Sequence, residues 1–452
     1  MPYHQELRYG TPQHAKICDA VVNRFRSSKR TMSKRYEAWT KAENLYLSYR
    51  PEKEEEATRR KAQEKGANTY AQLTIPYSYA TLLTAHTYWT SVFLARDPVL
   101  QYTGRHGESQ QKVQAIEALV DYQIQVGAFV VPLYLWLLDA GKYGVGIVGT
   151  YYTDEVVKVA SIQDVPVMLG GLIRIPGKTK RQRVEEVIPG YSGTKLYNVR
   201  PFDFFPDPKV SFTNFQQGEF CGRVVDMSRG ALAASSEGYF NLDKVRETMN
   251  KTPSIMRETG SSQIELPEKM TDFQFFPGEK SKDNFTVLEM VWDLVPSEWG
   301  LGDSDTAEKW VVTVVEETIV IGCRPQGMYH NKFPYAIQTY EMEGSSHMLR
   351  GMMEILGPMN GGLDWLLNSH FFNVRKALND QWIIDPSKIV LKDLLDGGPG
   401  KLIRMHPSAY GTDVRTALSQ VPTVDVTGRH IADAEILMQM MQRVTGVTDN
   451  VM

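Results

Sequence analysis

The spacing of apolar residues changes along the chain, and this change constrains the fold more than any other feature. Residues 70–95, 109–126 and 131–140 keep the three- and four-residue spacing of amphipathic helices. Proline at Ile75-Pro76 fits the entry of the first helix, and Gly141 is expected to end the third. Six residues of the middle helix are expected to face inward: Val113, Ile116, Ala118, Leu119, Tyr122 and Ile124.

Strand-like segments follow these helices. Segments rich in β-branched and aromatic residues, with glycine or proline at their margins, cover 145–152, 186–188 and 220–225. Residues 285–295 and 308–322 resemble a strand pair joined by a long exposed loop, and 333–340 is extended. The order predicts an α+β fold in which a helical layer is followed by an antiparallel β layer.

The last third of the chain returns to the helical spacing twice. Residues 346–379 and 429–443 have amphipathic patterns, and the segment between them, 380–428, alternates strand and turn signals. Gly357-Pro358 and Gly361-Gly362 interrupt the first pattern, which predicts a kink or two shorter helices. Two helices are therefore expected to bracket a small β-rich insert.

Length and charge limit the possible functions. A chain of 452 residues is too long for one compact core, so two to four domains are expected. The formal net charge is −3, from 50 basic and 53 acidic residues. A protein that grips duplex DNA is usually strongly basic, because its affinity comes from neutralised phosphates. The balance argues against tight DNA binding and leaves open a protein past which DNA slides.

Cysteine usage and hydropathy indicate a soluble chain from a reducing compartment. Cys18, Cys221 and Cys323 are far apart and odd in number, so neither a zinc motif nor a disulfide framework is predicted. The N-terminal residues lack the apolar region of a secretory signal. The longest apolar stretch, 129–138, is much shorter than the roughly 20 residues that cross a membrane.

No motif for catalysis emerges. The glycine-rich stretch 141–146 lies between a helix and a strand, whereas a phosphate-binding loop opens a helix, so a tight turn is predicted. The nine histidines lack metal-binding spacing, and His86 in its aromatic helix is expected to be a packing residue. The stretch PFDFFPDP (201–208) is typical of a proline-fixed turn with aromatic anchors. We predict no catalytic, metal-binding or cofactor-binding residues and no cofactor.

Two charged runs allow more than one interpretation. Residues 24–35 hold six basic residues and no acid, which fits a solvated helix face or a surface that touches DNA or an acidic partner. Residues 52–66 combine opposite charges at helical offsets, which is typical of an exposed helix or connector.

Several segments, taken in order, resemble the tailed-bacteriophage portal (head-to-tail connector) family over about residues 30–452. None is a chemical signature alone, and their joint order carries the resemblance. They are RYEAWTKAENLYLSY, LTIPYSYATLLTAHTYWTSVFLARDPV, QAIEALVDYQIQ, DAGKYGVGIVGTYY, VRPFDFFPDP, LRGMMEILGPMNGGLDWLLNSHFFNVRKALND, and GPGKLIRM followed by QMMQRVTGVTDN.

The resemblance implies a domain layout. Residues 1–345 would form an N-terminal arm and wing, 346–379 the first stem helix and 380–428 the clip. Residues 429–452 would form the second stem helix and the start of a channel loop. Portals of this family continue into a C-terminal crown, which here either lies beyond Met452, the reading that we favour, or is absent.

The resemblance also implies a function. Portal subunits form a ring, usually of twelve, at one capsid vertex of the virion, after assembly in the host cytoplasm. Double-stranded DNA enters through the ring during packaging and leaves through it during ejection, without sequence-specific contacts. The implied partners are the terminase motor, the tail adaptor, and the major capsid and scaffolding proteins. Neither an enzymatic activity nor a membrane is implied.

Two sets of candidate residues follow. Polar residues at four- and seven-residue steps of the first stem helix are expected to line the channel, unless the helix is simply an amphipathic surface helix. They are Asn360, Asp364, Asn368 and Arg375, with Leu363, Leu366 and Val374 expected between subunits. In the clip, Lys388, Lys392, Lys401 and Arg404 are candidates for docking the motor and adaptor, with Gly397–Gly400 as the projecting turn. The alternative is a surface hairpin without a partner.

Two other functions stay open at this point. One is a different phage structural ring or shell protein, which the stem–clip–stem order disfavours. The other is a soluble enzyme with an unrecognised site, which the missing motifs disfavour.

Overall fold

A computed structural model describes residues 4–49, 60, 73–105, 107–169, 173–228, 230, 232, 238–248, 284–341, 350–378, 382–395, 403–411, 413, 418–420 and 427–447. The charged run 52–66 lies outside these residues except for Arg60. The described residues group into two compact units. Unit 1 contains those up to Tyr49 and from Ser78 to Ile355, and unit 2 contains those from Ala57 to Tyr77 and from Leu356 onward. Helices and antiparallel sheets together confirm the α+β class.

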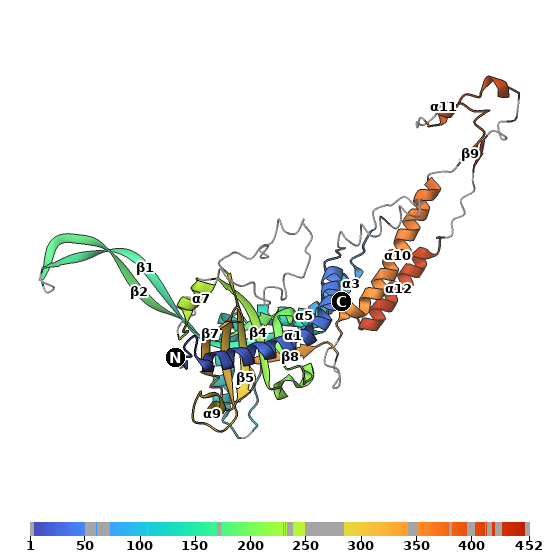
Figure 1. Cartoon of the computed structure of the whole chain (residues 1–452). Coiled ribbons are helices and arrows are strands. Elements are labelled where there is room, and N and C mark those ends of the chain that lie inside the picture. The colour runs from blue at the N-terminus through green and yellow to red at the C-terminus, as the bar shows by residue number, and fades with distance from the viewer. Residues whose placement is uncertain are drawn as a thin grey trace. The chain divides into compact units, whose positions relative to one another are not determined.

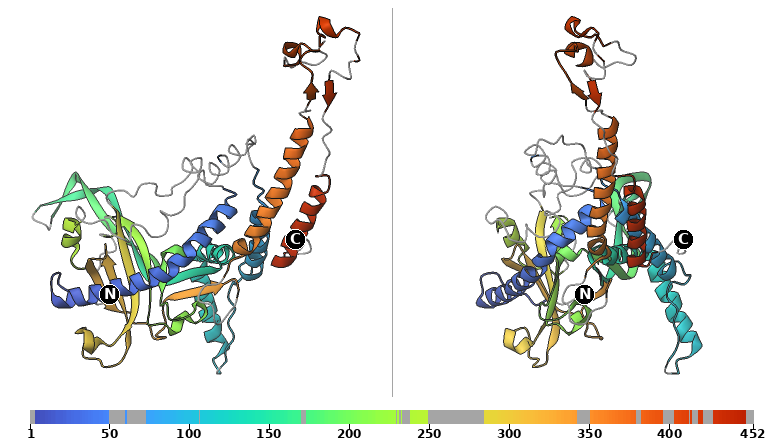
Figure 2. Two further views of the ribbon diagram at one scale, coloured as in Figure 1. Left: turned by 45° about the vertical axis from the view of Figure 1, so that its right-hand side comes forward. Right: turned by 90° about the vertical axis from the view of Figure 1, so that its right-hand side faces the viewer.

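Helix α1 (Pro12–Tyr46) crosses the main sheet of unit 1 and joins two cores (Figures 1 and 2). Thr11 caps it by accepting a hydrogen bond from the His14 N–H at 3.3 Å, and Pro12 occupies the first turn. Its first half buries Ile17, Val21 and Phe25 against the five-stranded sheet. Its second half buries aromatic residues, including Trp39, against the segment around Phe202. The helix is continuous through the basic run 24–35.

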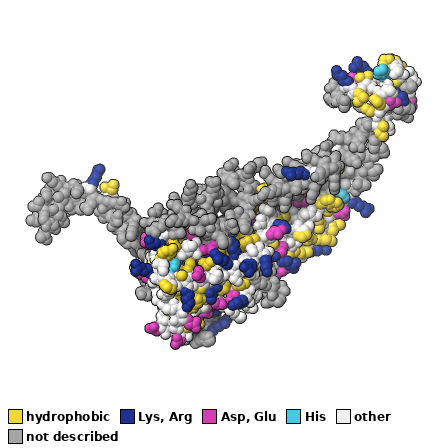
Figure 3. Space-filling view, in the orientation of Figure 1, with side chains coloured by type: hydrophobic (Ala, Val, Ile, Leu, Met, Phe, Trp, Pro, Cys, Tyr) yellow, Lys and Arg dark blue, Asp and Glu magenta, His cyan; other side chains and the backbone are white. Residues whose placement is uncertain are grey.

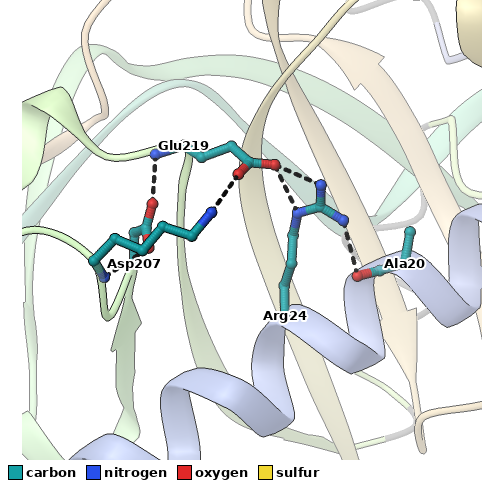
Figure 4. A network of polar contacts seen from close by, with 5 residues as sticks. Ala20, Arg24, Asp207 and Glu219 are labelled. Carbon is teal, nitrogen blue, oxygen red and sulfur yellow. Dashed lines mark hydrogen bonds and ion pairs between the residues drawn. The ribbon is translucent and has the colours of Figure 1, made fainter.

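The basic run of α1 finds acidic partners within its own chain. Arg24 donates two hydrogen bonds to the Glu219 carboxylate (Figure 4). Its guanidinium also stacks over the Trp292 ring at 4.0 Å. Arg26 pairs with Glu317 at 2.8 Å, and Arg35 pairs with Glu354. Three of the six basic residues therefore hold α1 to the rest of unit 1. Neither a solvated helix face nor a surface for DNA or an acidic partner had predicted these internal pairs.

The main sheet of unit 1 has five antiparallel strands in the order β3-β4-β5-β6-β7. The predicted pair 285–295 and 308–322 is confirmed by the β5–β6 register, in which Val291 lies opposite Val311. The second segment forms two strands rather than one, because Glu316 and Glu317 turn the chain with positive φ. The strands are β3 (Phe204–Pro206), β4 (Phe220–Ser228), β5 (Asn284–Leu294), β6 (Glu308–Val315) and β7 (Ile319–Pro325). Helices α7 (Leu242–Thr248) and α9 (Pro296–Trp299) flank the sheet.

A second sheet, in the order β2-β1-β8, continues into a long two-stranded ribbon. β8 (Tyr335–Thr339) pairs with β1 only from Val145 to Gly149. Beyond that point β1 (Val145–Leu169) pairs with β2 (Ile173–Val199) alone. The ribbon is labelled in Figure 1. The strands predicted at 145–152 and 186–188 are parts of β1 and β2 and were predicted far too short.

Helices α3 (Tyr77–Phe93), α4 (Gln110–Val126) and α5 (Val130–Tyr143) confirm the predicted helices of unit 1. Helix α5 continues past Gly141 and ends at Gly144, whose φ of 88° suits glycine. Gly141 lies inside the helix. A Cβ there would approach the Leu82 side chain to 2.7 Å, so glycine at this position allows α5 to pack closely on α3. The glycine-rich stretch is thus a helix-to-strand turn, as predicted.

The inward residues predicted for α4 are mostly wrong. Of the residues of this helix, Ile124 alone is buried, and Ile116, Leu119 and Tyr122 are more than half exposed. The spacing does place an apolar stripe on the helix, but no described segment covers it.

No single described helix has the length and hydropathy to cross a membrane; α4 and α5 pass that test only as a pair bent by 78°.

The aromatic turn PFDFFPDP is confirmed. Phe202, Phe204 and Phe205 are fully buried, and the Ser28 hydroxyl donates to the Pro206 carbonyl at 2.6 Å. Asp207 accepts hydrogen bonds from the N–H groups of Lys209 and Glu219, both at 2.9 Å (Figure 4). The short 3-10 helices Pro201–Asp203 and Phe212–Gln217 flank this turn.

Unit 2 is built on helices α10 (Met352–Leu378), whose first turn belongs to unit 1, and α12 (His430–Thr445). Between them lie β9 (Trp382–Ile384), α11 (Leu391–Leu395), the 3-10 turn Pro407–Ala409 and β10 (Leu418–Gln420). Of the two outcomes predicted for the first helix, a division into two shorter helices is wrong, because α10 runs without a break through Pro358 and Gly361-Gly362. A kink at Pro358, whose missing N–H removes one intrahelical hydrogen bond, stays a prediction.

Candidate functional site: the α10–α12 pair and the segment between

The predicted polar stripe of α10 binds an extended segment of its own chain. Asn368 accepts a hydrogen bond from the Leu73 N–H at 2.9 Å and donates one to the Leu73 carbonyl at 2.8 Å. Asp364, one turn earlier, accepts from the Ile75 N–H at 2.9 Å. Two side chains four residues apart thus satisfy alternate backbone groups of residues 73–75, as a neighbouring strand would.

The four channel candidates differ in exposure. Asn360 and Asp364 are buried, Asn368 is partly buried, and Arg375 is exposed near the C-terminal end of α10. Asn360 and Arg375 also have polar interactions within the chain. The stripe does lie on one side of the helix, and whether that side borders a channel stays a prediction.

Pro76 is the one local feature that indicates an extended segment at 73–75. Proline at 76 disfavours helical conformation at Ile75 and keeps its N–H available for a side-chain acceptor. The acceptors lie about 290 residues away in sequence, so no local pattern could identify them.

Helices α10 and α12 pack through small and polar contacts. A Cβ at Gly362 would lie 3.4 Å from Leu437, so glycine lets the two helices approach closely. Buried Thr427, just before α12, bonds to Asn373 at 3.0 Å and to His370 at 3.2 Å. Figures 1 and 2 show the two helices side by side.

In the segment between the helices, the clip of the portal resemblance, the described residues form little core. β9 and β10 pair over three residues, and Ile389 forms an isolated antiparallel bridge with Met405. Among its described residues only Ile389 and Ala409 are buried, whereas Ile383, Leu391, Ile403 and Tyr410 are exposed. In Figure 3 its described side chains mix apolar, basic and acidic groups.

Two of the four docking candidates are engaged inside this segment. Arg404 forms a two-pronged contact with Asp393, at 2.7 and 2.9 Å, which raises the pKa of the guanidinium. Lys388 lies 3.3 Å from Asp385, whose pKa is lowered mainly by the hydrogen bond from the Ser387 hydroxyl. Lys392 is exposed on α11, and Lys401 with the turn 397–400 lies outside the described residues.

Catalytic chemistry finds no support in the described part of the chain. No three His, Cys, Asp or Glu residues gather there as a metal site would require. Burial raises the pKa of Cys18 and Cys323 to about 12 and raises that of Cys221 further, so these thiols are poor nucleophiles. His86 is fully buried, and its Nε2 bonds to the Tyr134 carbonyl at 3.0 Å. It packs in the helical core, as predicted.

A comparison with protein families identifies the class. The family described as Phage SU10 portal protein matches residues 89–452, which include both helices of unit 2 and everything between them. The chain is therefore a phage portal protein, and it belongs to the family of the phage SU10 portal protein. The resemblance predicted from the sequence is confirmed. A search of curated proteins finds no match.

Membership has general consequences. The family is structural and non-enzymatic, and it implies ring assembly and association with the capsid of the virion.

Proposed function

We propose that this protein forms a ring, of twelve copies, at one capsid vertex, and that double-stranded DNA passes through it in both directions. The family match over residues 89–452 carries this proposal. DNA would enter during packaging and leave during ejection. Terminase and the tail adaptor would bind in succession to the exposed end of the ring.

The charge of the subunit supports passage rather than binding. At −3 per subunit, twelve copies carry a formal charge of about −36. Each phosphate neutralised by Lys or Arg adds to affinity, so a strongly basic channel would hold the duplex. The basic run of α1 does not alter this argument, because three of its residues pair within the chain.

The polar side of α10 remains our candidate for the channel side. In that arrangement residues 73–75 would lie between the lumen and the side chains of Asn360, Asp364 and Asn368. Asp364 and Asn368 would hold this segment in place by hydrogen bonds. Arg375 would be the candidate nearest to DNA.

The apolar stripe on α4 is our candidate for a contact between wings. Ile116, Leu119, Tyr122 and Val126 recur at helical spacing and are all about half exposed. Exposed apolar residues that lie together on one face mark protein interfaces. Leu119→Glu should weaken ring assembly, whereas Gln114→Glu, on another side of α4, should leave it unchanged.

Electron microscopy and mass photometry of the purified protein test the ring directly. We expect a ring with a central hole and a mass of about twelve subunits of 51.2 kDa. Monomers or dimers across a wide concentration range would contradict the proposal. A closed shell without a hole would instead favour a different phage structural protein.

A further inference from the structure

The far end of the β1–β2 ribbon is a two-stranded segment that no third described strand supports. This ribbon end comprises residues 161–169 of β1 and 173–184 of β2, beginning at the pair Ser161 and Val184. β8 pairs with β1 only as far as Gly149, and Figure 1 shows β1 and β2 extending together away from the five-stranded sheet. Two strands alone are at best marginally stable in water, so a partner is expected to contact the ribbon end.

The ribbon end concentrates positive charge. It contains five basic residues and one acid, Asp164, a formal charge of +4 in a chain whose total is −3. Glu185 and Glu186 follow directly on β2, so the positive charge is confined to the end of the ribbon. All five basic residues lie on β2, in a stretch without an acid: Arg174, Lys178, Lys180, Arg181 and Arg183. The near-neutral balance of the whole chain hides this local excess.

The basic residues occupy both faces of the ribbon. Positions 178 and 180 share one face of β2, and 181 and 183 share the other, because successive residues of a strand alternate between faces. Asp164 lies directly opposite Arg181 and is the only acid opposite any of the five. The side chains of Ile162 and Arg181 are described, and both are exposed.

The composition favours a polyanion over a protein surface as the partner. The buried centres of protein–protein interfaces are enriched in tyrosine, tryptophan and phenylalanine and depleted in charged residues. The ribbon end contains no aromatic residue, and nearly a quarter of its positions are basic. Clustered Lys and Arg without acids are the electrostatic signature of a surface that neutralises phosphates.

We propose that the ribbon end binds the phosphate backbone of duplex DNA without reading its sequence. The choice of duplex DNA rests on the proposed function, which brings DNA to the ring. The major groove of B-DNA admits a two-stranded β-ribbon, and basic residues on both faces then meet the phosphates on either side of the groove. This contact uses residues of unit 1, whereas the channel candidates are on α10 in unit 2.

Such a contact is compatible with the passage of DNA. About four phosphate contacts give weak binding that depends strongly on salt and lets a protein slide along the duplex. The ribbon end would therefore keep DNA close to the subunit without stopping its movement.

Neutralising the ribbon end tests the contact in the full chain. Lys178→Gln with Lys180→Gln and Arg183→Gln removes three positive charges and leaves Arg181 opposite Asp164 in place. Fluorescence anisotropy of a labelled duplex of mixed sequence measures binding between 50 and 200 mM salt. At 50 mM salt we expect the dissociation constant to rise at least about tenfold. The slope of log K against log salt should become shallower by about 3, since each phosphate contact contributes about 1.

Two further variants serve as controls. Arg30→Gln with Lys34→Gln and Lys112→Gln removes the same charge from exposed positions of α1 and α4 and should bind DNA like the original protein. Lys178→Arg with Lys180→Arg and Arg183→Lys keeps the charge of the ribbon end and should also bind normally. Circular dichroism, thermal melting and mass photometry establish that all variants match the original protein in fold and assembly.

The possible results separate the inference from the proposed function. Undiminished DNA binding by the ribbon variant, or no binding by the original protein at 50 mM salt, would overturn the inference and leave the ring proposal standing. An equal loss in the α1–α4 control would show that DNA responds to net charge alone, which also refutes the site. Labelled poly-glutamate that binds more tightly than DNA, and is lost in the ribbon variant, would assign the site to an acidic protein instead. If the original protein forms no ring, the proposed function fails, and the same assay on the unassembled subunit still decides the inference.

Discussion

At the scale of single residues, Asp139 of α5 lies in a group of charges whose balance depends on pH. It accepts a hydrogen bond from Asn198 at 3.1 Å. Nearby, the buried Lys142 ammonium pairs with Glu43 at 2.6 Å and lies over the Tyr46 ring. Burial raises the pKa of Asp139 to about 6, against the partial opposition of Lys142.

The raised pKa predicts the effect of Asp139→Asn. In the unfolded chain the pKa of Asp139 is near 3.8. Between pH 4 and pH 6 the folded protein therefore keeps a proton on this carboxyl group that the unfolded chain releases. The stability that this proton provides is present below pH 4 and is lost as pH rises through 6. Asp139→Asn should therefore stabilise the protein at pH 7.5 by up to about 3 kcal/mol, and by less where solvent reaches the half-buried side chain.

Thermal melting from pH 4 to pH 8 measures this difference. The gain in melting temperature should shrink toward zero at pH 4. Asp121→Asn on α4 serves as a control for the loss of one charge. An equal gain at all pH values would contradict the assignment.

Asn368 provides a second test at this scale. Asn368→Leu removes both hydrogen bonds to Leu73 at similar volume, which should cost only about 1 kcal/mol because Leu73 is half exposed and water can replace the lost partner. Hydrogen exchange at the Leu73 amide should accelerate, because its acceptor is lost. Ser369→Ala, the next residue of the same helix, should leave that exchange unchanged. Unchanged exchange in Asn368→Leu would mean that other contacts hold the segment.

The polar stripe shows how far a local pattern extends. Four-residue spacing correctly places Asn360, Asp364 and Asn368 on one side of α10, because the period of a helix fixes which residues share a face. What that side contacts depends on residues 73–75, which only the folded chain brings near. Sequence spacing therefore predicts the stripe but not its partner.

At the scale of elements, a glycine in α10 separates helix stability from assembly. Gly361→Ala should stabilise the isolated subunit by about 0.5–1 kcal/mol, because alanine loses less backbone entropy and meets no neighbour there. If Gly361 receives a side chain of the next copy, the same change should weaken ring assembly.

Gly362→Ala is the matched control, since its Cβ would point toward Leu437 within the chain. It should change melting temperature without changing assembly. Melting curves of the subunit and mass photometry across a dilution series measure the two effects. Improved assembly of Gly361→Ala would argue against a close approach at this position.

The helices were easier to predict than the strands for a physical reason. A helix repeats its spacing over many residues, so 109–126 was placed within one residue of α4. The β1–β2 ribbon contains prolines and a basic stretch that weaken a strand pattern, yet its pairing comes from backbone hydrogen bonds and continues to Leu169. The inward residues of α4 failed because an apolar stripe does not specify which molecule covers it.

At the scale of the whole molecule, length and segment order predicted more than composition did. A chain of 452 residues required several domains, and two units are found. The order of weak segments identified the portal family, which the match over residues 89–452 confirms. The boundary between the units lies inside α10, and no change of composition marks it.

In segment 380–428, the clip of the portal resemblance, the charges of the described residues separate into two groups. Arg404 is engaged by Asp393, and Lys388 lies near Asp385, so these residues hold the segment together. Lys392 is exposed on α11 and is the described candidate best placed to meet an acidic partner. Because the described residues of this segment bury few side chains, its shape depends on such internal pairs, whereas any encounter with a partner would depend on the charges that remain accessible.

Charge reversal in the clip should therefore affect docking but not the ring. Lys388→Glu with Lys392→Glu is expected to leave ring assembly intact and to weaken binding of terminase or the tail adaptor about three- to tenfold at low salt. The loss should shrink at 0.5 M salt, where screening acts within a few ångströms. Lys392→Glu alone should account for most of the loss of binding, since Lys388 is near Asp385.

Arg404→Met, which breaks the Asp393 contact, should instead loosen the clip and weaken docking equally at both salt concentrations. Normal packaging and tail attachment by rings without residues 380–428 would show that docking occurs elsewhere.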